Sequence, residues 1–114
     1  MKKYNRIKKT SEYAELYSNH FSFKGRYFIL LGQNNYPDTL TVGIVTSKKV
    51  GKAVVRNRKR RQVRAFLLEN PHLWLLNKRV VIIARKTGVT ANWSQLKKDL
   101  GELFQRLNRF KEKS

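Results

Sequence analysis

The chain has 114 residues, with 26 Lys or Arg against 7 Asp or Glu for a formal net charge of +19, and 40% of its residues are hydrophobic. This length predicts one domain with a single modest core, and the hydrophobic content argues against a disordered chain. The chain has no cysteine, which excludes disulfides, thiolate nucleophiles and cysteine-based metal sites.

The positive charge predicts the kind of partner. Self-repulsion on this scale opposes a compact fold unless a polyanion supplies counter-charge, so we expect nucleic acid or an anionic membrane. No apolar run approaches the roughly 20 residues that span a bilayer. The opening residues MKKYNRIKKT are basic and lack the apolar segment of a signal peptide. A cytoplasmic protein is therefore expected.

The N-terminal residues predict a basic tail and then a short helix. Residues 1–9 carry five cations and little that could be buried. Thr10 or Ser11 suits the N-cap of the helix. Glu12 in the first turn complements the helix dipole, and the helix is expected to end near Asn19.

One face of this helix is aromatic. It presents Tyr13, Leu16 and Tyr17, with Phe21 beyond its end. Such spacing is typical of a core-facing surface, but aromatic rings beside basic side chains also form stacking platforms for unpaired bases. The residues alone leave both interpretations open.

Two strands are predicted next. Arg26–Gly32 is a β-prone apolar run flanked by glycine. The link QNNYPDT, with the turn signal Pro37-Asp38, leads to a second strand at Leu40–Ser47. This strand can bend at Gly43. The short link favours an antiparallel hairpin between the two strands.

Charge is concentrated in residues 48–64, where nine of seventeen residues are Lys or Arg and none is acidic. We expect a loop at Lys48–Lys52 and then a helix at Ala53–Glu69 that stops before Pro71. One helix face is polar and cationic: Arg56, Asn57, Arg60, Arg61 and Arg64. A neighbouring arc is apolar and faces the sheet: Val55, Val63, Phe66 and Leu67. Lys59 falls within the apolar arc, so either its ammonium extends to the edge or the helix is rotated.

The C-terminal part predicts one more strand and one more helix. His72–Lys78 is apolar but short, and both a loop and a last helical turn fit it. Arg79–Arg85 is typical of a strand covered on both faces and parallel to the second strand. Asn92 and Gln95 have the spacing of a capping box. The helix that follows has apolar positions at helical spacing: Leu96, Leu100, Leu103, Phe104 and Leu107.

No catalytic or metal-binding constellation is evident. His20 and His72 lie far apart in the sequence, and the carboxylates are scattered mainly through predicted helices, where solvated faces or salt bridges are their expected roles. Binding is the better-supported function, because each cation that contacts a phosphate releases counterions. RNA is preferred to DNA because aromatic side chains beside cations suit single strands.

The basic segment carries a family resemblance. SKKVGKAVVRNRKRRQVR, at Ser47–Arg64, resembles the signature of the bacterial ribonuclease P protein subunit. The resemblance continues in the family's order through NRIKKTSEY, Arg26-Tyr27-Phe28, VGIVTSKK, VVIIARK and the final helix. Lys59 departs from the pattern, because the family usually has an aliphatic residue there.

The resemblance implies an α/β (α+β) fold. It predicts one domain over residues 1–114, built as a small two-layer sandwich with the element order α-β-β-β-α-β-α. This fold is similar to domain 2 of ribosomal protein S5 and has an unusual left-handed crossover between parallel strands, against the general rule for such connections.

The resemblance also implies partners and sites. In the family, a large RNA carries out the Mg²⁺-dependent endonucleolytic removal of the 5′ leader from precursor tRNA, and the RNA and substrate hold the Mg²⁺. The RNA-docking residues of the family correspond here to Lys48, Lys49, Lys52, Arg56, Asn57, Arg58, Arg60, Arg61 and Arg64. The aromatic residues that grip the leader correspond to Tyr13 and Tyr17. A further family aromatic aligns with Leu31, and Tyr27, four residues earlier on an alternating strand, is a candidate substitute.

Two other functions are compatible with the charge. A structural ribosomal protein or general RNA-binding protein would bind RNA without a catalyst. A polybasic membrane-surface module is disfavoured, because the apolar stripes are committed to a core. Neither a membrane nor an obligatory protein partner is expected.

Overall fold

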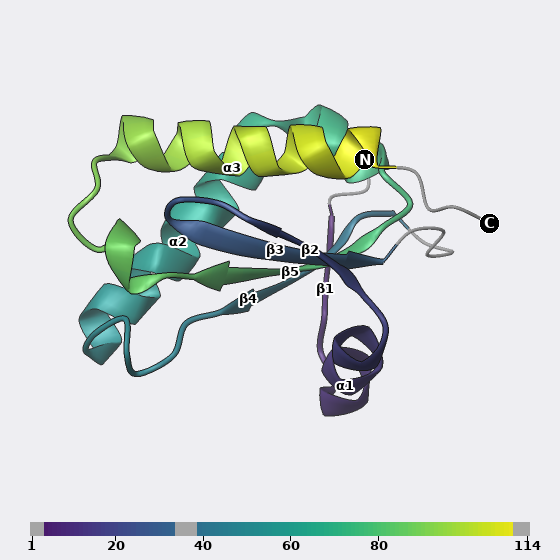
Figure 1. Cartoon of the computed structure of the whole chain (residues 1–114), viewed down its shortest axis with the longest axis horizontal. Helices are drawn as coiled ribbons and strands as arrows, with labels where there is room; N and C mark the ends of the chain where they lie inside the picture. The colour runs from purple at the N-terminus through teal and green to yellow at the C-terminus, as the bar shows by residue number, and fades with distance from the viewer. Residues whose placement is uncertain (1–3, 34–38, 111–114) are drawn as a thin grey trace.

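The computed structural model describes residues 4–33 and 39–110, which form one mixed β-sheet with helices on both faces. In chain order the elements are β1 (Asn5–Arg6), α1 (Thr10–Ser18), β2 (Phe21–Lys24), β3 (Phe28–Gln33), β4 (Thr41–Val45), α2 (Ala53–Glu69), the 3₁₀ helix η1 (Pro71–Leu75), β5 (Arg79–Ala84), the 3₁₀ helix η2 (Lys86–Gly88) and α3 (Trp93–Arg109). Figure 1 shows α3 above the sheet and α1 below it, with α2 slanting from the lower left, beside the strands, up to α3.

Strand β5 occupies the centre of the sheet, in the order β1-β4-β5-β3-β2. It pairs in parallel with β4 and antiparallel with β3. The parallel neighbours predicted from the sequence are therefore confirmed. The left-handedness of their crossover stays an expectation from the family resemblance.

The predicted hairpin between residues 26–32 and 40–47 is wrong, because β5 lies between β3 and β4. The apolar side chains of β5 are buried on both of its faces, which suits a central position. The antiparallel partner of β3 on its other side is β2, with Phe21 opposite Gly32 and Lys24 opposite Ile29. Sequence reasoning from the residues missed β2, a segment of only four residues. The predicted turn at Pro37-Asp38 lies outside the described residues.

The main core lies between the sheet and the helices α2 and α3. Its buried side chains include Phe28, Leu30, Val42, Val80, Ile82, Val63, Phe66, Leu67, Leu96, Leu100, Leu103, Phe104 and Leu107. A smaller cluster on the other face of the sheet holds Ile7, Leu16, Leu31 and Val81. The two-layer sandwich is thus confirmed, with α1 added over part of the outer face.

The N-terminal segment from residue 4 is not a free tail. Strand β1 pairs in parallel with β4, and Ile7, only 8% exposed, is anchored by its backbone N–H on the Val42 oxygen at 3.0 Å. The arm is also held by Tyr4, whose ring centroid lies 6.2 Å from that of Trp74, and by the Asn5 backbone N–H, which donates to the Leu40 oxygen at 2.7 Å. The N-cap of α1 is Lys9, not Thr10 or Ser11, and its backbone N–H donates to the Glu12 carboxylate.

The two long helices follow the predicted patterns. Helix α2 has the predicted bounds, and Pro71 opens η1, which settles the conformation of the first part of His72–Lys78. The capping box of α3 is confirmed: the Asn92 side chain accepts from the Gln95 backbone N–H at 2.8 Å, and the Gln95 side chain accepts from the Asn92 N–H at 3.0 Å.

A carboxylate of α3 fixes the turn before β3. Asp99, 7% exposed, accepts three backbone hydrogen bonds of 2.9 to 3.0 Å from Arg26, Tyr27 and Phe28. Gly25 is required in this turn, because a Cβ there would lie 2.7 Å from the Asp99 carboxylate. Residues 26 and 27 therefore belong to the turn and not to the predicted strand.

Candidate nucleic-acid interface

The basic loop is built to present lysines at the start of α2. Val50 is buried and anchors the loop, while Lys48, Lys49 and Lys52 are exposed. Gly51 has a φ of +150°, a conformation that favours glycine. The loop therefore directs its ammonium groups away from the core, toward solvent or an anionic partner.

The predicted cationic face of α2 is present. Asn57, Arg58 and Arg61 are exposed, while Arg56, Arg60 and Arg64 are half-buried. The Arg60 guanidinium donates to the Asn57 side-chain oxygen at 2.9 Å. Within the described part of the chain, no arginine of α2 forms an ion pair. These guanidinium groups are therefore available for phosphates.

Lys59, the misfit of the helical pattern, is buried beneath this face. Its side chain is among the most deeply buried of the chain, at 2% exposure, and its Nζ donates to the Gly88 carbonyl of η2 at 2.6 Å. The ammonium therefore neither reaches solvent nor indicates a rotated helix. It links α2 to η2, which follows β5.

Burial, with a smaller contribution from the charge of Arg58, lowers the pKa of Lys59 below its ordinary value of 10.5. The unfolded chain then binds this proton more tightly, so the free energy of unfolding rises with pH between the lowered pKa and 10.5. We expect Lys59→Met to remove this rise, which amounts to about 1.4 kcal/mol per unit of pKa shift. Urea unfolding of the wild-type and Lys59→Met proteins between neutral pH and pH 10 measures this rise. If the free energy of unfolding changes with pH in the same way for both proteins, the burial of a charged lysine is contradicted.

The two tyrosines of α1 lie at the edge of the same surface. Their ring centroids are 6.2 Å apart, and Tyr17 is 44% exposed. The Tyr13 ring covers Gly43 of β4 so closely that a Cβ at Gly43 would lie 2.7 Å from it. Burial, with smaller contributions from Tyr17 and Glu12, raises the pKa of Tyr13. Glycine at position 43 therefore makes room for the ring.

A groove of about 110 Å³ joins the cationic helix to the aromatic one. Arg60 and Arg64 of α2 form one part of its lining and Tyr13 of α1 another, and β4 contributes Gly43. Its full lining is Tyr4, Arg6, Ile7, Tyr13, Val42, Gly43, Ile44, Arg60 and Arg64. Tyr13, from the predicted aromatic set, thus lines the same groove as Arg60 and Arg64, from the predicted docking set.

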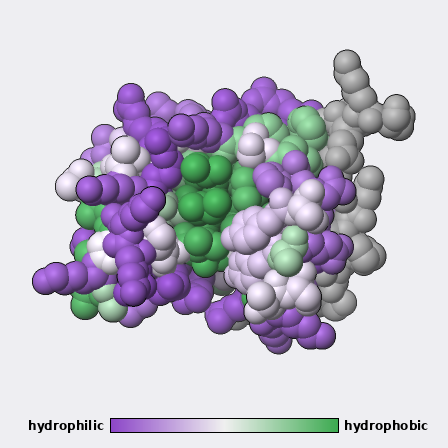
Figure 2. Space-filling model, turned by 60° about the horizontal axis from the view of Figure 1, so that its bottom comes forward, coloured by the Kyte–Doolittle hydropathy of each residue, from purple (hydrophilic) through white to green (hydrophobic). Residues whose placement is uncertain are grey.

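The sheet face beside α1 remains partly open. Figure 2 shows a hydrophobic patch bordered by hydrophilic surface on this side of the molecule. The half-buried side chains of Ile29, Val45 and Ile83 lie here over the buried Leu31 and Val81. The patch offers an apolar floor next to the tyrosines.

A polar network holds α1 at the border of this patch. Arg79, 2% exposed, forms an ion pair with Glu15 of α1 at 3.1 Å and donates to the Gln33 side-chain oxygen. The Gln33 amide in turn donates to the Asn19 carbonyl at 2.7 Å, just past the end of α1. The distance between α1 and the sheet is therefore fixed by side chains of β3 and β5.

Tyr27 does not join the other two tyrosines. It lies in the turn before β3, near Gly88 and in a shallow depression with Gln95 and Asp99 of α3. The prediction that it shares a strand face with Leu31 was wrong because the turn held by Asp99 ends the alternation before β3 begins. Leu31 itself is buried beneath α1.

Sequence reasoning also missed groove residues. Tyr4 and Arg6 were assigned to the tail. The sequence feature that could have placed them at the sheet is Ile7, an apolar residue in a basic stretch. Arg79 was seen only as the charged end of a strand, since its partners are distant in the sequence.

Within residues 4–33 and 39–110, no group of His, Asp and Glu side chains is arranged to hold a metal ion. None of the helices described is long and apolar enough to cross a membrane.

Comparison with known proteins gives a consistent result. A family model described as Ribonuclease P matches residues 1–108. The ribonuclease P protein component of Bacillus pumilus is 38% identical over 108 residues, which cover 93% of this chain and 90% of that protein. The solved Staphylococcus aureus RNase P protein superposes with a TM-score of 0.82 at 30% identity, covering 96% of this chain and 100% of that one. The RNase P protein of Thermotoga maritima superposes with a TM-score of 0.81 at 25% identity, covering 90% of this chain and 96% of that one.

These matches span nearly the whole chain, including the basic loop, the cationic helix and both tyrosines of α1. The chain belongs to the ribonuclease P protein family.

Proposed function

We propose that this protein is the non-catalytic subunit of an endoribonuclease whose active site is RNA. In this proposal the protein docks on ribonuclease P RNA and holds the 5′ leader of precursor tRNA during removal of the leader. The RNA and the substrate hold the Mg²⁺ that supports cleavage. The proposed location is the cytoplasm.

The observation that carries the proposal is the groove between Tyr13 and the pair Arg60 and Arg64. Single-stranded nucleic acids are bound where a cationic track for phosphates runs beside aromatic or apolar surface for bases. Here the guanidinium groups supply the track, and Tyr17 with the open sheet face supplies the surface. An RNA strand that leaves the docking helix along this groove reaches the tyrosines of α1 directly.

The test is reconstitution at low Mg²⁺. A bacterial ribonuclease P RNA is incubated with 5′-labelled precursor tRNA, with and without the protein, and the cleavage end is mapped. Protein-dependent release of the leader at the mature 5′ end is the expected result. Tight RNA binding without stimulation would instead favour a structural RNA-binding protein.

Tyr17→Ala is expected to weaken binding of precursor tRNA to the reconstituted complex by about 1 to 3 kcal/mol per lost base stack, and to leave mature tRNA unaffected. Tyr27→Ala is the matched control, because it removes a tyrosine that lies against α3 instead of α1. Fluorescence binding titrations with both tRNAs measure the effect. Equal losses for precursor and mature tRNA would refute contact with the leader.

A further inference from the structure

Helix α1 carries the two tyrosines of the candidate site, but little apolar contact holds it on the sheet. Of its nine residues only Leu16 is fully buried, in the small cluster with Ile7, Leu31 and Val81. One buried side chain fixes where the helix touches the sheet, but it does not fix the rotation of the helix about its own axis. Further contacts are therefore needed to set the direction of the other side chains of α1.

A polar network supplies such contacts. Arg79 of β5 is 2% exposed, and its Nη2 lies 3.1 Å from Oε1 of Glu15 in α1. The Arg79 Nε donates to the Gln33 side-chain oxygen at 3.0 Å, and the two residues are direct neighbours in the register of β3 and β5. The Gln33 amide donates to the Asn19 carbonyl at 2.7 Å. The network thus ties two strands to α1 at its middle and just past its end.

Helix geometry couples this network to the tyrosines. At about 3.6 residues per turn, Glu15 and Tyr17 lie on opposite flanks of Leu16, each about 100° from it around the helix axis. A Glu15 side chain held toward Arg79 therefore sets the rotation at which Tyr17 emerges on the other flank, where it is 44% exposed. Tyr13, which lines the groove, lies between Leu16 and Tyr17 on this wheel. A rotation of α1 would thus move both rings.

The burial of Arg79 favours an orienting role over a stabilising one. Its side chain is 3% exposed, whereas that of its partner Glu15 is 69% exposed. Removing a guanidinium from water is costly, and apolar side chains often replace a buried ion pair without loss of stability. The planar guanidinium instead directs its hydrogen bonds, so it favours one arrangement of the groups around it.

We propose that Arg79 and Glu15 are positioning residues for the leader of precursor tRNA. Their ion pair holds α1 at the rotation that presents Tyr13 and Tyr17 to an unpaired RNA strand, and neither residue of the pair contacts the RNA. This inference rests on the proposed function, because it assigns a role in leader binding. Docking of ribonuclease P RNA on α2 does not depend on the pair.

The charge of Glu15 makes the expected result opposite to that of simple electrostatics. Removing a carboxylate from α1 makes the protein more positive, which by itself strengthens binding to RNA. The positioning role predicts weaker binding of the leader. Glu15→Ala and Glu15→Gln change the charge equally, but only glutamine keeps a side-chain oxygen that can accept from the Arg79 guanidinium. The two variants therefore separate positioning from charge.

Binding of precursor and mature tRNA to the reconstituted complex tests the proposal. We expect Glu15→Ala to weaken precursor binding by about threefold to tenfold and Glu15→Gln to stay within about twofold of wild type, as for partners in one polar network. Binding of mature tRNA and of ribonuclease P RNA should not change. In cleavage assays the KM for precursor tRNA should rise in Glu15→Ala without a change in kcat, since only substrate binding is affected.

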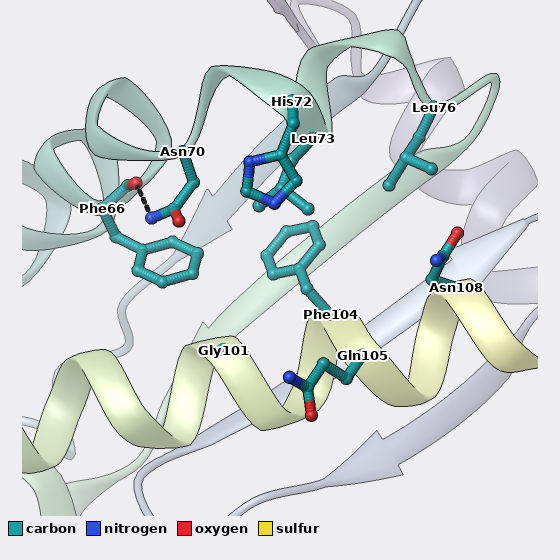
Figure 3. Close-up of a pocket in the computed structure, with 9 residues that line it drawn as sticks. All are labelled: Phe66, Asn70, His72, Leu73, Leu76, Gly101, Phe104, Gln105 and Asn108. Atoms are coloured by element: carbon teal, nitrogen blue, oxygen red, sulfur yellow. Dashed lines mark hydrogen bonds between the residues drawn. The ribbon is translucent and has the colours of Figure 1, made fainter.

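A second pair of variants tests the network from β3. Gln33→Ala removes the amide that joins Arg79 to the end of α1 and should also weaken precursor binding. Its matched control is Gln105→Ala, which removes the same kind of side chain from an exposed position of α3. Figure 3 shows Gln105 on α3 beside a cavity of about 390 Å³, whose lining comes from α2, η1, α3 and the residues next to them. This control should bind precursor tRNA as wild type does.

The outcomes distinguish this proposal from the proposed function. If Glu15→Ala and Glu15→Gln bind precursor tRNA equally well while Tyr17→Ala loses the preference for precursor, the leader contact stands and the positioning role is wrong. If the wild-type protein gives no preference for precursor over mature tRNA, the leader contact itself fails, and the positioning role fails with it. Thermal unfolding should show all variants of Glu15 folded, because the side chain is exposed and alanine and glutamine both favour helix.

Discussion

Replacing Arg60 and Arg64 together by alanine is expected to lower the affinity for ribonuclease P RNA by about tenfold to a hundredfold and to reduce the salt dependence of binding. Each guanidinium that neutralises a phosphate releases condensed counterions, so the slope of log K against log salt should fall by about 1 to 2. Both side chains are half-buried and line the groove, so their guanidinium groups are held in place and not free in solvent. A held guanidinium can form directed hydrogen bonds with a phosphate in addition to the charge attraction.

The matched control is Arg106→Ala combined with Arg109→Ala, which removes two exposed arginines from α3 that do not line the groove. Equilibrium binding over a series of salt concentrations measures both slopes. The control should leave the slope near that of the wild-type chain. Equal slopes for the two double variants would show that the protein is a diffuse polycation without the docking face described above.

Asp99→Ala is expected to lower the free energy of unfolding by about 2 to 4 kcal/mol. The carboxylate accepts from three consecutive backbone N–H groups at residues 26–28, and its loss leaves these donors, one buried and two partly buried, without their partner. A loss of this size is a large share of the stability of a small domain. Because the turn leads directly into β3, we expect the pairing of β2 with β3 to loosen as well.

Glu102→Ala is the control, since it removes an exposed carboxylate one turn further along the same helix. Urea unfolding of the three chains measures the difference, and hydrogen exchange at Tyr27 and Phe28 locates it. A loss no larger than that of Glu102→Ala would contradict the role of Asp99 in fixing the turn.

Periodic elements could be predicted from the sequence, and pairings between distant segments could not. The bounds of α2 and the cap of α3 follow from local side-chain chemistry within a few residues. The partners of β3 and the docking of Ile7 on β4 depend on which segments meet in space, and the length of a link does not reveal this. The family resemblance supplied the order of the main elements but not the joining of β1 to the sheet.

The candidate site shows the same division. The cationic face of α2 is a local pattern, so its arginines could be identified from spacing alone. The meeting of Tyr13 with Arg60 and Arg64 could not, since residues of four elements, β1, α1, β4 and α2, line the groove. Tyr27 was wrongly predicted to lie on β3. Asp99, more than 70 residues away in the chain, accepts from its backbone N–H and holds it in the turn before that strand. The burial of Lys59 could not be predicted either, because its acceptor, the Gly88 carbonyl, belongs to η2, which follows β5 in the chain.

The central position of β5 determines when the sheet can form during synthesis of the chain on the ribosome. Neither β3 nor β4 has its main neighbour until Arg79–Ala84 has been synthesised, so the nascent chain cannot assemble its sheet from the first two-thirds of its length. Its most cationic helix is made earlier and waits without a core to pack against. In that interval the basic segment is present without the complete sheet, so its cations are open to any polyanion near the nascent chain.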